Sequence, residues 1–161
     1  MMGQPQALTA SGVTFDRLVH RNDLRSEWGS WDSRQVDVED FAAGMLRFEG
    51  GAALSLETSW LGFQRERDHT YLHWYGTNAG ATWPGCRVFG ERAGHPWDIQ
   101  LSGPQTPSAH ALLIRAFAEA VLDNQPEPIP PRDSARVVAM LEALYASAAA
   151  SAEVRLDTSI V

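Results

Sequence analysis

Apolar and polar residues alternate in short runs along the first two thirds of the chain, a pattern typical of β-strands. The runs predict a strand at residues 6–15, a strand on each side of a Gly-rich turn within residues 40–60, and a meander of short strands beyond residue 71. Residues 16–35 have no sustained period and predict a long exposed loop. The pattern therefore predicts a predominantly antiparallel, open sheet.

The turn at Glu49, Gly50 and Gly51 decides which side chains of its two strands share a face. With a two-residue turn, the face toward the core is expected to carry Phe41, Ala43, Met45, Leu54, Leu56 and Trp60. The opposite face is then expected to carry Leu46, Phe48, Ser55 and Glu57. Such a mixed face suits contact with water or with another subunit.

The period changes to that of a helix near Thr106, an N-cap candidate, and Pro107 suits the first helical position. Asn124 and the prolines that follow it end this first helix. A second helix is predicted from Pro131 or Asp133, and its expected buried residues are Val137, Val138, Leu141, Leu144, Tyr145 and Ala148. We therefore expect an α+β fold, a single domain over residues 1–161, with two C-terminal helices packed on one face of the sheet.

Three blocks of sequence, in order, carry a family resemblance. They are VEDFAAGMLRFEGGAALSLETSW, HTYLHWYGTNAGA and FAEAVLDNQPEPIPPRDSARVVAMLEALYASAAASAEVRL. They resemble the central strand pair, a later strand and the closing helix pair in the C-terminal domain of the Gfo/Idh/MocA oxidoreductases, the family of glucose-fructose oxidoreductase and inositol dehydrogenase. The resemblance covers nearly all of the chain. It implies an NAD or NADP cofactor held by an N-terminal Rossmann domain that is absent from this sequence.

Composition excludes several other classes of protein. The net charge of −7 disfavours nucleic acid and anionic membrane surfaces as partners. Cys86 is the single cysteine, and no apolar run approaches the ~20 residues of a membrane-spanning helix. We expect a cytoplasmic protein.

The sequence contains no Gly-rich phosphate-binding motif, so we expect no cofactor site in this chain. The resemblance implies that the catalytic Lys, Asp and His also lie outside it, and we assign no catalytic residue. Asp16 and His20 have the spacing of the family's Asp-His pair but lack its central glycine, and we interpret them as loop residues. His69 and His73 would lie about 13 Å apart along a strand, too far to share a metal ion, so no metal site is predicted.

One cluster combines an aromatic ring with hydrogen-bonding groups suited to the hydroxyls of a polyol. It consists of Trp60, Arg65, Arg67, Asp68 and His69. The resemblance implies that this segment faces the substrate, and the alternative is a solvated charged loop. A weaker group of the same kind is Arg21, Asn22, Trp28 and Trp31 in the early loop.

These observations favour the substrate-site and oligomerisation domain of an NAD(P)-dependent oxidoreductase acting on a sugar, cyclitol or related polyol, inactive when isolated. We expect a homo-oligomer, a dimer through the sheet face opposite the helices, where Leu46, Phe48 and Ala53 would be exposed. The alternatives are a stand-alone oligomerising or ligand-binding α+β module, and a small cofactor-free enzyme that uses the loop histidines.

Overall fold

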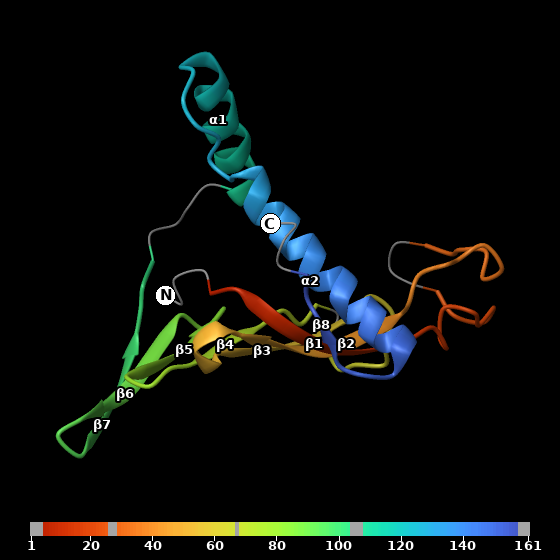
Figure 1. Ribbon diagram of the computed structural model, residues 1–161, viewed down its shortest axis with the longest axis horizontal. Coiled ribbons are helices and arrows are strands. Elements are labelled where there is room, and N and C mark those ends of the chain that lie inside the picture. Colours follow the sequence, from red (N-terminus) through yellow and green to blue (C-terminus); the bar gives the residue numbers. More distant parts are fainter. Residues whose placement is uncertain (1–4, 26–28, 67, 104–107, 158–161) are drawn as a thin grey trace. The chain divides into compact units, whose positions relative to one another are not determined.

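The computed structural model describes residues 5–25, 29–66, 68–103 and 108–157 (Figure 1). It contains two helices and two antiparallel four-stranded sheets, which confirms the α+β class with C-terminal helices. The predicted strands form two separate sheets within the described residues. The chain divides into two compact units, Met1–Phe63 with Ile129–Val161 and Gln64–Pro128.

The first unit is a sheet covered on one face by a helix. Its strands lie in the order β3 (Ala53–Ser59), β2 (Phe41–Phe48), β1 (Ala7–Phe15) and β8 (Val154–Arg155). The helix α2 (Pro131–Ala150) crosses this sheet over β1 (Figure 1). Ala10, Leu46 and Leu144 form the centre of the core between helix and sheet. The two-residue strand β8 had no recognisable signal of its own in the sequence.

The predicted faces of the β2–β3 hairpin were wrong. The turn is a 3-10 segment of three residues, Glu49–Gly51, and the N–H of Phe48 donates to the carbonyl of Ala52 at 2.9 Å. A turn with one more residue than predicted moves every side chain of β3 to the other face relative to β2. Leu46 therefore pairs with Leu54, and Met45 with Ser55.

This register places Leu46 and Phe48 on the face toward the helix, not on the free face. Leu46 is only 2% exposed, and Phe48 packs against the same core. The free face of the first sheet instead carries Phe41, Ala43 and Met45 of β2, Val13 and Phe15 of β1, and Ala53, Ser55 and Glu57 of β3.

The predicted buried stripe of α2 was also wrong in most positions. Leu144 is buried and Ala148 partly so, but Val137, Val138, Leu141 and Tyr145 are between 43% and 52% exposed. The helix meets the sheet through small residues instead. Gly12 and Gly44, paired across β1 and β2, lie under Leu144, and Ser147 is 2% exposed. The side of α2 that packs on the sheet is therefore determined by the shape of the sheet surface, which cannot be predicted from the helix sequence alone.

The second unit contains a sheet in the order β4 (Leu72–Tyr75), β5 (Ala79–Trp83), β6 (Arg87–Arg92) and β7 (His95–Gln100). This confirms the predicted meander. Its register gathers apolar side chains on one face, among them Leu72, Trp74, Trp83, Val88 and Ile99. The other face carries His73, Tyr75, Thr82, Arg87, Phe89 and Asp98.

The helix α1 spans Ala109–Leu122, and none of its residues is buried. Its predicted cap, Thr106 with Pro107, lies outside the described residues. The helix ends as predicted near Asn124, which has a positive φ of 49° while the N–H of Gln125 donates to the carbonyl of Ala120. In the described part of the chain, neither helix combines the length and apolar character needed to cross a membrane.

Candidate substrate-facing site

Trp60 follows directly after β3 and lies at the end of the first sheet. Its side chain is 44% exposed, and its indole N–H donates to the carbonyl of Glu39 at 2.7 Å. The ring meets Trp31 edge to face, with the centroids 5.4 Å apart and the planes at 72°. Two indoles held in this arrangement offer a rigid apolar surface beside backbone and loop polar groups.

Trp31 belongs to the early loop and is tied by a hydrogen bond to an earlier residue of it. Its indole N–H donates to the carbonyl of Val19 at 2.7 Å. His20 contacts the carbonyl of Ser33 through Nδ1 at 3.0 Å, and its Nε2 lies 3.5 Å from a carboxylate oxygen of Asp16. Both side chains of this Asp16–His20 pair are at least half exposed, which fits the interpretation as loop residues.

The remaining predicted site residues belong to the second unit, and Arg65, Asp68 and His69, which the structure describes, are exposed. His69 bonds Glu66 at 2.7 Å through Nδ1, and Asp68 accepts a hydrogen bond from the hydroxyl of Thr70 at 3.1 Å. Arg65 is exposed, and Arg67 lies outside the described residues. The structure therefore joins Trp60 to Trp31 and His69 to Glu66, two pairings that the sequence pattern did not specify.

His69 also begins a row of rings that runs along β4. The centroids of His69 and Tyr71 are 5.0 Å apart, those of Tyr71 and His73 5.3 Å, and those of His73 and Tyr75 6.3 Å. Alternate residues of a strand share a face, which explains the row. The tyrosine hydroxyls and the imidazoles of this row can donate and accept hydrogen bonds, and the neighbouring carboxylates can accept them. A ligand with several hydroxyls needs both kinds of partner.

Glu39 and Asp40 were missed by the sequence analysis, although both support this region. The side chain of Asp40 is buried. The carbonyl of Glu39 accepts a hydrogen bond from the indole of Trp60. Its carboxylate accepts one from the hydroxyl of Tyr145 of α2 at 2.5 Å. The hydrogen bond that the Tyr145 hydroxyl donates to Glu39 raises the pKa of Tyr145. An acidic pair at the start of a strand is too common in sequences to indicate such a role.

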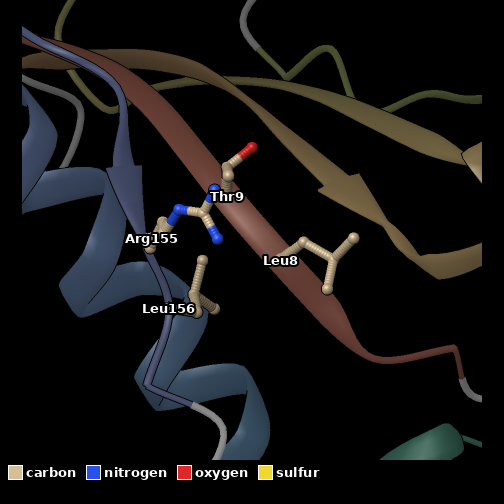
Figure 2. A pocket seen from close by; sticks show the side chains of 4 residues that line it. All are labelled: Leu8, Thr9, Arg155 and Leu156. Atoms are coloured by element: carbon tan, nitrogen blue, oxygen red, sulfur yellow. The ribbon is translucent and has the colours of Figure 1, made fainter.

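Two hollows lie elsewhere in the first unit. The larger, about 300 Å³, is lined by Leu8 and Thr9 of β1, Arg155 of β8 and Leu156, as Figure 2 shows. A smaller one of about 70 Å³ lies between α2 and the sheet and is lined by Tyr145, Leu141 and Glu39 among others. Trp60 and His69 line neither of them. Trp60, Arg65, Asp68 and His69 are instead exposed on the surface of their own units.

The described residues do not fit a dinucleotide. α2 follows Pro130, α1 follows Ser108, and neither described helix start carries the Gly-rich loop that brings backbone N–H groups to a pyrophosphate. Within the same residues, no three His, Cys, Asp or Glu side chains gather as a metal site requires. Neither group can be placed on the described chain.

Comparison with known proteins gives partial matches. No family model matches the sequence. D-glucoside 3-dehydrogenase of Escherichia coli (strain K12) is 25% identical over 157 residues, which cover 97% of this chain and 44% of that protein. The chain therefore spans less than half the length of this curated relative.

Solved structures share the fold over a similar span. An oxidoreductase domain protein from Kribbella flavida matches with a TM-score of 0.73 and 13% identity, over 95% of this chain and 46% of that one. Levoglucosan dehydrogenase in complex with NADH and levoglucosan matches with a TM-score of 0.69 and 15% identity, over 94% of this chain and 45% of that one. The resemblance seen in the sequence is confirmed: this chain resembles the C-terminal domain of the Gfo/Idh/MocA-type sugar oxidoreductases.

Proposed function

We propose that this chain is the substrate-site and oligomerisation domain of an NAD(P)-dependent oxidoreductase acting on a sugar, a cyclitol or a related polyol. The observation that carries the proposal is the match of 97% of this chain to 44% of a D-glucoside 3-dehydrogenase. A levoglucosan dehydrogenase that shares the fold was solved with NADH and levoglucosan. The remaining part of such an enzyme supplies the nucleotide site.

The isolated chain is accordingly inactive in hydride transfer. Its described residues lack a phosphate-binding loop at either helix start. Calorimetric titration of NADH into the chain tests this, and the expected result is no saturable binding in the micromolar range. Saturable micromolar binding would refute the claim.

The substrate-facing residues in this proposal are Trp60, Arg65, Arg67, Asp68 and His69. The exposed indole of Trp60 and the exposed imidazole of His69 support it, since neither side chain is buried within its own unit. Stacking on an aromatic ring together with hydrogen bonds from charged groups is a chemistry that suits a sugar ring and its hydroxyls.

The test uses the open reading frame that contains this chain, expressed together with any Rossmann domain encoded upstream in frame. We expect Trp60→Ala, Arg67→Ala and His69→Ala to raise the KM for the sugar by about tenfold, equivalent to ~1.4 kcal/mol, and to leave cofactor affinity unchanged. His95→Ala, an exposed histidine at the start of β7, is the matched control. Unchanged kinetics in all three variants would favour a solvated loop.

The proposed dimer contact is the face of the first sheet that α2 does not cover, with the residues that the observed register places there. Val13 and Phe15 are each 50% exposed, Met45 is 37% exposed, and the rings of Phe15 and Phe41 lie 6.0 Å apart. Arg47 and Glu57 place both signs of charge on this face, so two copies related by a two-fold axis can oppose unlike charges. A second copy of the chain is therefore the proposed partner.

The stand-alone module remains the competing function. An in-frame Rossmann sequence upstream supports the oxidoreductase, and a start codon with no such sequence before it supports the module.

A further inference from the structure

Asp40 is the one buried carboxylate among the residues that the structure describes. It lies immediately before β2 and is 3% exposed. A buried carboxylate is stable only where hydrogen bonds offset the loss of its hydration. The partners of Asp40 therefore identify what this residue holds in place.

Those partners come from two strands and one turn. Oδ2 of Asp40 accepts hydrogen bonds from the backbone N–H groups of Leu18 at 2.6 Å and Val19 at 2.9 Å. The backbone N–H of Asp40 donates to the carbonyl of Phe15 at 2.8 Å, and its carbonyl accepts from the hydroxyl of Ser59 at 2.8 Å. Asp40 thus joins the ends of β1 and β3 and the start of β2 to the turn at residues 17–20.

Each indole of the candidate site donates to a residue that takes part in these bonds or is next to one that does. Trp31 donates to the carbonyl of Val19, whose own N–H is held by Asp40. Trp60 donates to the carbonyl of Glu39, the residue that precedes Asp40 in the chain. The backbone segments that fix the two rings are therefore connected through a single side chain.

We propose that Asp40 is the positioning residue of the Trp31–Trp60 pair: its carboxylate ties the backbone of Val19 to the segment that begins at Glu39, and so sets the edge-to-face geometry of the two rings. The use of these rings to contact a sugar rests on the proposed function, whereas the geometry itself does not. An anionic acceptor suits this role, because hydrogen bonds to a charged oxygen are about twice as strong as those between neutral groups. Without it, the described residues of the turn would retain one hydrogen bond between backbone groups, from the N–H of Arg21 to the carbonyl of Leu18.

The exciton couplet in the far-ultraviolet circular dichroism of the whole chain reports on this geometry directly. Two indoles at a centroid distance of 5.4 Å couple strongly. Trp31→Phe and Trp60→Phe each remove one partner and define the signal of the uncoupled state. A residue that contributes only to overall stability would not change the couplet in a sample that remains folded.

We expect Asp40→Ala to lose more than half of the couplet amplitude at a urea concentration where the chain is still folded. Asp40→Asn should restore most of it, because the amide oxygen can still accept from both N–H groups. Asp37→Ala, an exposed aspartate of the same loop, is the matched control and should leave the couplet unchanged. A full couplet in folded Asp40→Ala overturns the proposal.

Hydrogen exchange in the unmodified chain gives a second measurement should Asp40→Ala fail to fold. The amides of Leu18 and Val19 and the indole N–H groups of Trp31 and Trp60 are expected to exchange together, as one opening unit. Indoles that exchange much faster than the two amides overturn the proposal. Because neither measurement uses a sugar, a Trp60→Ala enzyme with an unchanged KM would refute the substrate role and leave the Asp40 result standing.

Discussion

Two glycines determine how closely α2 approaches the first sheet. A Cβ atom at Gly12 would lie 2.5 Å from the carbonyl oxygen of Leu144, and one at Gly44 would lie 2.5 Å from a methyl carbon of Leu144. The close approach also lets the hydroxyl of Ser147 accept the N–H of Gly12 at 2.9 Å and donate to the carbonyl of Ala152 at 2.6 Å. Among the described residues, β8 pairs with β1 only at Thr9 and Ala10, so the serine provides an acceptor for the N–H of Gly12.

Gly12→Ala is therefore expected to lower the free energy of unfolding by about 1–3 kcal/mol, the usual cost of forcing an extra carbon into a packed contact. Urea denaturation of the whole chain measures it. Gly103→Ala is the control, since a Cβ there would meet no atom within 4 Å. Equal stability of the two variants would show that α2 can shift away from the sheet at no cost.

The hydrogen bond of Tyr145 predicts how the stability of the chain depends on pH. Its hydrogen bond to Glu39 raises its pKa above the unfolded value of 10.0. A raised pKa means that the stabilisation is fully present below about pH 10 and is lost as the pH rises through the folded value. The difference in Tm between the wild type and Tyr145→Phe should be constant at neutral pH and shrink above pH 10. A difference that persists there would contradict this assignment.

At the scale of elements, the strands and helices were readable from the sequence but the faces were not. Alternation located β1, the hairpin and the meander, and Asn124 located the end of α1, because these signals depend only on neighbouring residues. The faces of the hairpin depend on one extra turn residue, and those of α2 depend on Gly12 and Gly44. Trp60 and His69 were identified from their side-chain chemistry. The contacts of Trp60 with Trp31 and of His69 with Glu66, and the burial of Asp40, result from how loops fold back on the chain. No local sequence pattern specifies that.

The corrected register predicts opposite effects for two neighbouring hairpin positions. Phe48→Glu places a charge against the Leu46 core and should destabilise the chain by several kcal/mol, since a buried unpaired charge is costly. Met45→Glu, on the free face, should leave the stability of the folded monomer within about 1 kcal/mol of the wild type when both are compared at a concentration too low for dimers. Denaturant titrations of both variants measure the difference. A larger loss of stability in Met45→Glu than in Phe48→Glu would instead support the register that a two-residue turn gives.

For the whole molecule, the free face of the first sheet predicts a dimer that depends on Met45 and Phe15. Light scattering after size exclusion should give the mass of two chains for the wild type and of one chain for Met45→Glu or Phe15→Glu, because a charge there would be buried between two apolar surfaces. Glu49→Lys, in the turn, is a control with altered charge outside the face. A wild-type monomer at high micromolar concentration would refute this interface.

The three-residue turn also limits how this hairpin can vary in length. Adding or removing two residues at Glu49–Gly51 keeps the existing partition between helix-facing and free side chains, whereas a change of one residue exchanges them. Relatives that keep the same partition should therefore differ from this chain at the turn by even numbers of residues. A relative with an odd difference is expected to carry a compensating bulge, or to have exchanged large and polar residues along the whole of its second strand.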